Sequence, residues 1–177
     1  MTPTTLGTDT RSALAQGLLQ ELEQEAQTTR RVLERVPDKH LSWRPHAKSR
    51  TLGELALHIA IVPGGVAELF TGPSRAQAPQ FVDPIPGSAA ELIPALDDSL
   101  AKAKRAVGRM DDAALMEPWT LMRGDRELFT VPRVALLRSI MLNHWYHHRG
   151  QLTVYLRELD VPVPWVYGPS ADENPFA

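Results

Sequence analysis

The sequence contains no cysteine among its 177 residues. This absence excludes a disulfide, a thiolate ligand to a metal ion and a cysteine nucleophile. Any thiol chemistry would therefore need a sulfur atom that the substrate brings to the protein.

Long runs of one kind of residue are also missing. The 19 basic residues stand against 21 acidic ones, no segment gathers basic residues, and nothing favours nucleic acid as a partner. No apolar stretch approaches the roughly 20 residues that a membrane span needs. Residues 1–16 have neither the basic nor the apolar region of a signal peptide. We therefore expect a cytoplasmic protein that binds neither nucleic acid nor membranes.

The pattern that is present is the hydrophobic periodicity of helices. Apolar residues recur at steps of three and four in four segments, which run from about Thr10 to Val36, Thr51 to Phe70, Ser88 to about Arg109, and Thr130 to Asp160. Four helices of this length, joined partly by long connections, predict an all-α four-helix bundle with at least one crossover. We expect a single domain over residues 1–177, with its core at about 10–160 and a proline-rich tail at 161–177.

Capping residues predict where these helices begin. Asp9 and Thr130 are the expected N-caps of the first and last helices. Thr51 with Glu54, and Ser88 with Glu91, have the spacing of a capping box, in which each residue of the pair satisfies a backbone N–H of the other.

Proline and glycine mark the interruptions. Pro63-Gly64-Gly65 lies inside the second helix, where it predicts a kink or a local unwinding. This break either opens a pocket or eases helix packing, and we favour packing. Residues 71–87 are expected to form a long loop and residues 110–129 a connection, with a short extended piece at 127–129.

Histidines occupy positions where an apolar residue would be expected. His144 and His148 lie four residues apart, on the helix face that also carries Met141 and Leu152. Their Cβ atoms would lie roughly 5–6 Å apart, close enough for both imidazoles to reach one ion. His58 likewise lies on the apolar stripe of the second helix. These three histidines predict a divalent-metal site in the core of the bundle.

A less specific interpretation competes with this one. A single histidine on an apolar stripe is usually a core residue that is hydrogen-bonded to a carbonyl or to water. The case for ligation therefore depends on the inward pair at 144 and 148. His147 is the rival within the motif, because it also shares a face with His144, but it points to the other side. We interpret it as a flanking residue and a weak catalytic candidate.

The neighbours of these histidines have expected roles as well. Gln151 can hydrogen-bond to a ligand imidazole and fix its tautomer, or bond a carbonyl of a neighbouring helix. Arg149 is expected to be exposed or to form an interhelical salt bridge. His40 and His46 are expected to be solvated or capping groups, and the aromatic side chains to be core residues rather than a substrate cage.

The two segments WRPHAKSRTLGELALHIA (43–60) and NHWYHHRGQLTVYLRELDVPVP (143–164), with the tail YGPSADE (167–173), resemble the DinB/YfiT-like superfamily of metalloenzymes. The resemblance spans about residues 10 to 173. It implies an up-down-down-up four-helix bundle, often homodimeric, in which His58, His144 and His148 hold a divalent ion. Members studied as enzymes include S-transferases that use bacillithiol and an isomerase that uses mycothiol. The sequence departs from the family pattern at Pro63-Gly64-Gly65, where the helix normally continues.

Three neutral imidazoles leave the charge of a divalent ion uncompensated and favour an anionic further ligand. Since the protein has no cysteine, we expect a metal-dependent S-transferase or isomerase that activates a low-molecular-weight thiol for a small-molecule substrate. A hydrolase that uses metal-bound hydroxide is the alternative enzyme, and a non-enzymatic metal-binding or stress-response protein is the alternative outside catalysis. Zinc or nickel is the expected metal, with iron, manganese, cobalt or copper as alternatives.

Overall fold

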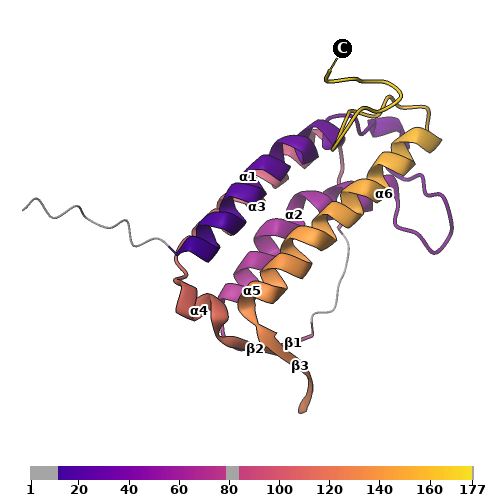
Figure 1. Ribbon diagram of the computed structural model, residues 1–177. Helices are drawn as coiled ribbons and strands as arrows, with labels where there is room; N and C mark the ends of the chain where they lie inside the picture. The colour runs from indigo at the N-terminus through magenta and orange to yellow at the C-terminus, as the bar shows by residue number, and fades with distance from the viewer. Residues whose placement is uncertain (1–11, 79–83, 177) are drawn as a thin grey trace, which may run out of the picture.

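The computed structural model describes residues 12–78 and 84–176, and most of them are helical. Four long helical segments lie side by side (Figure 1). They are α1 (Ala13–Leu33), α2 (Leu52–Thr71), α3 (Leu92–Val107), and a composite of α5 (Arg133–Leu136), η3 (Leu137–Asn143) and α6 (His144–Glu158). Shorter pieces are η1 (Asp38–His40), η2 (Ala89–Glu91) and α4 (Asp112–Met116).

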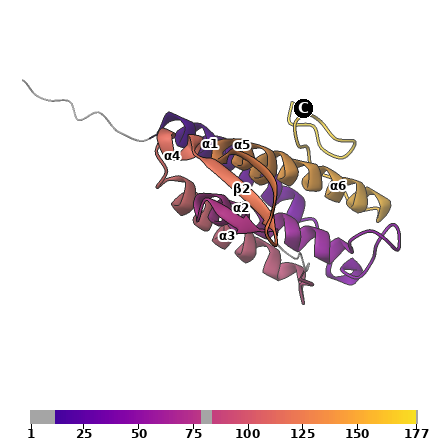
Figure 2. The same cartoon turned by 90° about the horizontal axis from the view of Figure 1, so that it is seen from below.

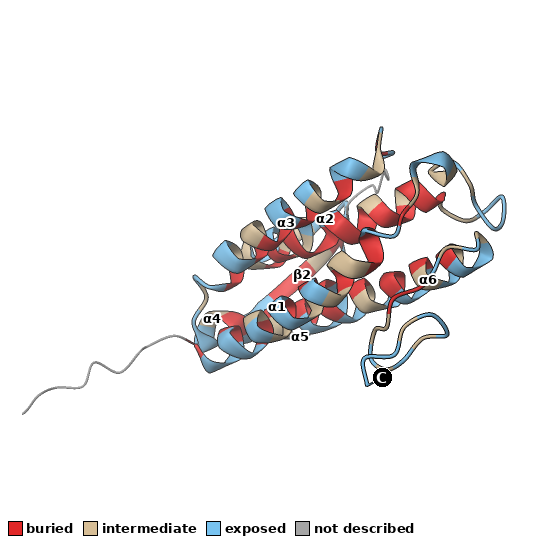
Figure 3. Cartoon of the chain, turned by 90° about the horizontal axis from the view of Figure 1, so that it is seen from above, coloured by how far each residue is buried: buried red, intermediate tan, exposed pale blue. Residues whose placement is uncertain are grey.

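The helix α2 lies at the centre of the packing. It contacts both α3 and α6, and α1 contacts the same two helices. Buried residues line the inward sides of the helices, while the outer sides are exposed (Figure 3). Contrary to expectation, α2 is long and apolar enough to cross a membrane by length and composition, but 61% of its most apolar window is buried inside the protein. That burial is what the core helix of a folded domain shows.

The start of α2 follows the predicted capping box. The Thr51 hydroxyl accepts from the Glu54 amide at 3.1 Å, and the Glu54 carboxylate accepts from the Thr51 amide at 2.6 Å. At its other end the helix runs one residue beyond the predicted Phe70 and stops before Gly72. The ends of α2 therefore follow from local sequence signals.

The predicted unwinding at Pro63 is wrong, because α2 runs through this residue as one helix. Pro63 has no N–H for the carbonyl of Ile59, and the indole Nε1 of Trp145 donates to that carbonyl instead, at 2.8 Å. The Gly64 amide donates to the Ser99 hydroxyl, at 2.8 Å. The Trp145 side chain thus supplies the donor that Pro63 lacks, and Ser99 contacts α2 one residue further on.

The other helix starts differ from expectation in detail. Asp9 lies outside the described residues, and Ser12 caps α1 by accepting from the Ala15 amide. Ser88 accepts from the amide of Ala90, at 3.1 Å, rather than from that of Glu91. The predicted third helix therefore begins with the single 3₁₀ turn η2, and α3 follows it.

A small sheet corrects the all-α expectation. Its strands are β1 (Arg75–Gln77), β2 (Pro118–Arg123) and β3 (Arg126–Pro132), with β1 parallel and β3 antiparallel to β2. The sheet lies at the end of the molecule where α5 begins, away from the C-terminal tail, and in front of the helices when seen from below (Figures 1 and 2). It takes up parts of both segments that were predicted to be loop or connection.

Thr130 is therefore not a helix N-cap. It belongs to β3, where its hydroxyl lies 2.8 Å from that of Thr120 on β2. The last helical segment begins only at Arg133, and its first α-helical turn passes into the π-helical segment η3. This wider segment ends where His144 begins α6.

Residues 161–176 contain neither helix nor strand, but specific hydrogen bonds attach them to the helices. Asp172 pairs with Arg157 of α6 and accepts from the Val163 amide, at 2.8 Å for the latter. Glu173 pairs with Arg35, 2.5 Å away. The YGPSADE motif thus fastens the tail.

Candidate metal centre

The three histidines singled out from the sequence converge on one point. His58 comes from α2, and His144 and His148 come from successive turns of α6. The Nε2 atom of His144 lies 3.3 Å from that of His58 and 3.1 Å from that of His148. One ring nitrogen of each residue lies within 4.8 Å of the others.

This cluster sits in the core between two packed helices. His58 and His148 are 7% and 6% exposed, and His144 is half-buried. The spacing of four residues stacks His144 and His148 on the face that α6 turns toward α2. His144 therefore gives the cluster its most accessible ring.

Hydrogen bonding and burial leave two of these rings ready to bind a cation. Gln151 Oε1 lies 2.6 Å from Nδ1 of His148, and because that oxygen can only accept, Nδ1 carries the proton and Nε2 presents a lone pair. Burial lowers the pKa of His148 to about 4. Burial, followed by the charges of Arg50 and His147, also lowers the pKa of His144. Both rings are therefore neutral at pH 7.

The nitrogen separations fit a shared ion. Two nitrogens bound to one ion at about 2.0–2.1 Å lie about 3.3 Å apart at a tetrahedral angle and about 2.9 Å apart at a right angle. The separations of 3.1 and 3.3 Å fall in this range. Lone pairs that face one another at such distances repel unless a proton or a cation lies between them. The cluster is thus compatible with a metal ion held by three imidazoles.

The remaining histidines lie outside this arrangement. His147 is exposed, although its ring centroid is 5.2 Å from that of His148. His46 is exposed and its Nδ1 accepts from the Lys48 amide, while His40 ends the short helix η1. None of the three belongs to the cluster.

Arg50 is a residue that the sequence reasoning missed. Its positive charge acts on both His144 and His148 and lowers the pKa of each. It directly precedes the Thr51 cap of α2, and its carbonyl lies 3.4 Å from the hydroxyl of Tyr155 on α6. Nothing in the spacing of Arg50 indicates this position, because it depends on how the 41–51 segment packs against α6.

Arg149 forms the interhelical salt bridge that was one of its two expected roles. Its side chain is 1% exposed and lies 2.6 Å from the Glu25 carboxylate of α1. It also donates to the Tyr167 hydroxyl in the tail, at 2.5 Å, and to Thr29 of α1, at 3.1 Å. This residue joins α1, α6 and the tail beside the histidine cluster, and so stabilises the helix that carries two of the three rings.

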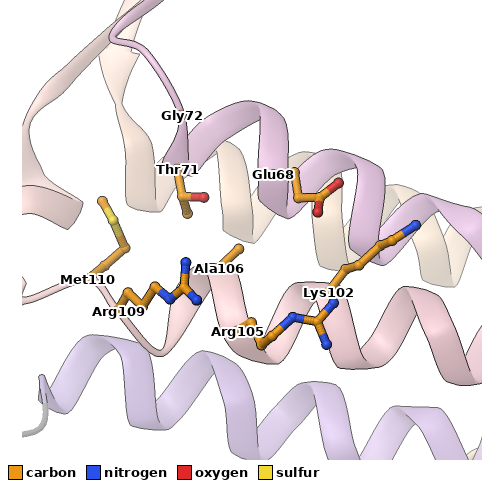
Figure 4. A pocket seen from close by; sticks show the side chains of 8 residues that line it. All are labelled: Glu68, Thr71, Gly72, Lys102, Arg105, Ala106, Arg109 and Met110. Atoms are coloured by element: carbon orange, nitrogen blue, oxygen red, sulfur yellow. The ribbon is translucent and has the colours of Figure 1, made fainter.

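A separate surface pocket of about 270 Å³ lies away from the histidines, between the end of α2 and the last turns of α3 (Figure 4). Three of its lining residues are basic, namely Lys102, Arg105 and Arg109. Positive side chains at this place complement the negative ends of two helix dipoles, and Lys102 also pairs with Asp98 at 2.7 Å. These roles account for the basic side chains of the pocket, and the histidine cluster is the stronger candidate for a functional site.

The fold and the cluster together define a class of protein: a mostly helical chain in which two packed helices present three inward histidines. A model of the DinB family matches residues 7–175, and the chain belongs to this family. The uncharacterized protein YrdA of Bacillus subtilis (strain 168) is 30% identical over 163 residues, which are 88% of this chain and 89% of that protein.

Solved structures have a similar fold. A DinB-like protein from Bacillus cereus is 28% identical, with a TM-score of 0.67, over 86% of this chain and 97% of that one. The DinB-like protein YjoA from Bacillus subtilis is 21% identical, with a TM-score of 0.63, over 85% of this chain and 97% of that one. The second likeness supports the fold alone.

Proposed function

We propose that this protein is a metal-dependent enzyme that activates a low-molecular-weight thiol for S-transfer or isomerisation. The observation that carries the proposal is the convergence of three imidazoles on one point, with Nε2 separations of 3.1 and 3.3 Å. His58, His144 and His148 are the proposed ligands. Zinc or nickel is the proposed metal, with iron, manganese or cobalt as alternatives, because imidazole binds all of these ions.

The donor set supports thiol chemistry. Three neutral ligands leave the charge of a divalent ion uncompensated, and such an ion lowers the pKa of a bound thiol. The chain has no cysteine, so the sulfur comes from a small molecule. In the proposed transfer the thiol loses its proton to solvent, its sulfur forms a bond to an electrophilic carbon, and a leaving group departs with its electron pair.

Arg50 supports a negatively charged reactant. Its charge is close enough to His144 and His148 to lower the pKa of both. A guanidinium beside the site attracts a carboxylate or a developing thiolate. In this proposal the charge of Arg50 attracts the reactant, and the role of His58, His144 and His148 is to hold the ion.

The proposal also includes the helix topology, the location and the oligomeric state of the protein. The four long helical segments are proposed to be the up-down-down-up bundle that the family resemblance implies, in a cytoplasmic homodimer. A stripe of uncharged residues on α2, spaced four apart, supports an interface between copies: Leu57, Ile61, Gly65 and Leu69. Ile61 and Gly65 of this stripe are exposed, and a Cβ atom at Gly65 would meet nothing within 4 Å.

A thiol-conjugation assay tests the activity. The metal-loaded protein is incubated with a fluorogenic haloalkane and, in turn, with bacillithiol, mycothiol, glutathione and cysteine. We expect conjugation above the uncatalysed rate with at least one thiol, and its loss with a chelator or with His148→Ala. The matched control is His147→Ala, which removes a histidine outside the cluster. Conjugation that survives both the chelator and His148→Ala would overturn the proposal.

A further inference from the structure

An interior proline frees a backbone acceptor directly beside the histidine cluster. In an unbroken helix the carbonyl of Ile59 would accept from the N–H of residue 63, which proline lacks. The Nε1 of Trp145 donates to this carbonyl across the α2–α6 contact, at 2.8 Å. The Trp145 side chain is fully buried, so the bond is shielded from water.

The two ends of this hydrogen bond are sequence neighbours of the cluster. Ile59 follows His58 on α2, and Trp145 follows His144 on α6. The Nε2 atoms of those two histidines lie 3.3 Å apart. One buried hydrogen bond therefore fixes how far apart, and in which rotation, the two helices present their rings.

A second contact holds α2 against rotation at the same level. The Gly64 amide donates to the Ser99 hydroxyl at 2.8 Å, and that hydroxyl donates to the Ile61 carbonyl at 3.0 Å. A Cβ atom at Gly64 would lie 2.7 Å from the backbone oxygen of Ser99, so α3 approaches too closely for any larger residue. The Pro63–Gly64 segment of α2 is thus held by α3 on one side and by α6 on the other.

We propose that Pro63 and Trp145 are positioning residues of the three-histidine site. Pro63 leaves the Ile59 carbonyl available, and the Trp145 indole uses it to set His58 against His144. This inference rests on the proposed metal function for its consequence, but the hydrogen-bond coupling between Pro63 and Trp145 can be measured without metal.

A double-mutant cycle over Trp145→Phe and Pro63→Ala tests the proposal. Cobalt(II) is the probe, since its visible absorption bands report both binding and coordination geometry. With Pro63 present, Trp145→Phe leaves the Ile59 carbonyl without a donor. We expect cobalt affinity to fall roughly tenfold, with altered bands, and the Tm of the metal-free protein to fall by roughly 5 °C. In the Pro63→Ala background the helix supplies its own N–H, and both losses should shrink to less than half.

Trp119→Phe is the matched control. Trp119 is as fully buried as Trp145, but its Nε1 has no hydrogen-bond partner in the described part of the chain. This variant should lower the Tm through lost ring volume and leave cobalt affinity within about twofold of the wild-type value.

The outcomes separate this inference from the proposed function. If the wild-type protein binds cobalt but Trp145→Phe changes affinity no more than Trp119→Phe, or equally with and without Pro63, the positioning role is overturned. If the wild-type protein binds no cobalt, the metal function and the positioning role fall together. The cycle in Tm would then still show whether the Pro63–Trp145 coupling itself exists.

Discussion

Gln151 Oε1 lies 2.6 Å from Nδ1 of His148, so an amide on the next turn of α6 decides which nitrogen of the imidazole carries the proton. Partners of this kind typically contribute a factor of 10 to 100 in metal affinity, because they hold the ring in one tautomer and orientation. We expect Gln151→Leu to weaken zinc binding by roughly tenfold or more, in a competition titration with a chromophoric chelator.

Thr153→Val is the matched control for this variant. It lies on the same helix, and its hydroxyl donates to the Gly150 carbonyl rather than to a histidine. Its zinc affinity should equal that of the wild-type protein. Equal affinity in Gln151→Leu would show that the His148 tautomer needs no such support.

Burial of His148 makes the stability of the metal-free protein depend on pH. The pKa falls from its ordinary value of 6.5 to about 4, so the folded state binds this proton less readily than the unfolded chain does. The stabilisation is therefore complete above pH 6.5 and is lost as the pH falls towards 4. Calorimetry in the presence of a chelator should show the Tm falling by roughly 5 °C over this window.

His148→Gln provides the comparison for the pH experiment. Glutamine does not titrate, and the decline of Tm between pH 6.5 and 4 should be visibly shallower in this variant. A decline of the same steepness would assign the pH dependence to other groups.

The buried cation of Arg149 predicts a large loss of stability. Its guanidinium lies 2.6 Å from the Glu25 carboxylate and 2.5 Å from the Tyr167 hydroxyl. In Arg149→Met the Glu25 carboxylate, whose side chain is 15% exposed, loses its cationic partner, which should cost about 3 kcal/mol in urea unfolding. The pair between Arg138 and Glu21 is largely exposed, and Arg138→Met should cost less than about 1 kcal/mol. Equal losses of unfolding free energy in Arg149→Met and Arg138→Met would contradict the stabilising role of the buried Arg149–Glu25 pair.

Two adjacent glycines in α2 should respond in opposite directions. A Cβ atom at Gly64 would lie 2.7 Å from the backbone oxygen of Ser99, whereas one at Gly65 would meet nothing within 4 Å. Gly64→Ala should therefore destabilise the protein by about 2 kcal/mol, through a clash between two backbones. Gly65→Ala should stabilise it by about 0.5–1 kcal/mol, through helix propensity. Urea unfolding of both variants measures this contrast, and a Gly64→Ala variant as stable as the wild-type protein would contradict the close α2–α3 approach.

The histidine cluster was accessible to sequence reasoning because helical spacing determines direction. Residues four apart, such as His144 and His148, lie on the same face of an α-helix. The apolar residues around them identify that face as inward. The partner ring of His58 followed from its own apolar stripe. Arg50 and the indole of Trp145 were not predictable in this way, since their positions depend on contacts between segments far apart in the sequence.

The extended piece predicted at 127–129 lies within β3, but the rest of the sheet was missed for a local reason. Arg123 and Arg126 pair across a two-residue connection, in which Gly124 has a φ of +59°. The Gly-Asp dipeptide at 124–125 is a hairpin signal. The strands around it lack strict alternation of apolar and polar residues, so periodicity alone gave no indication of them.

In the last helical segment, the hydrophobic periodicity correctly predicted a helix but did not indicate that part of it is π-helical. Leu137 to Asn143 form a π-helical segment directly before His144. Such segments are rare and are frequent at functional sites, but their side chains still recur at nearly helical intervals. The apolar pattern therefore predicted one continuous helix from Thr130, without the wider turn.

X-ray absorption of the zinc-loaded protein tests the central claim most directly, since it counts the imidazoles around the ion. One zinc per chain is expected, with three imidazole nitrogens at about 2.0–2.1 Å. His58→Ala, His144→Ala and His148→Ala should each lose that stoichiometry, while His147→Ala keeps it. A zinc content well below one per chain in the wild-type protein, or a first coordination sphere with fewer than three imidazoles, would contradict the proposed site.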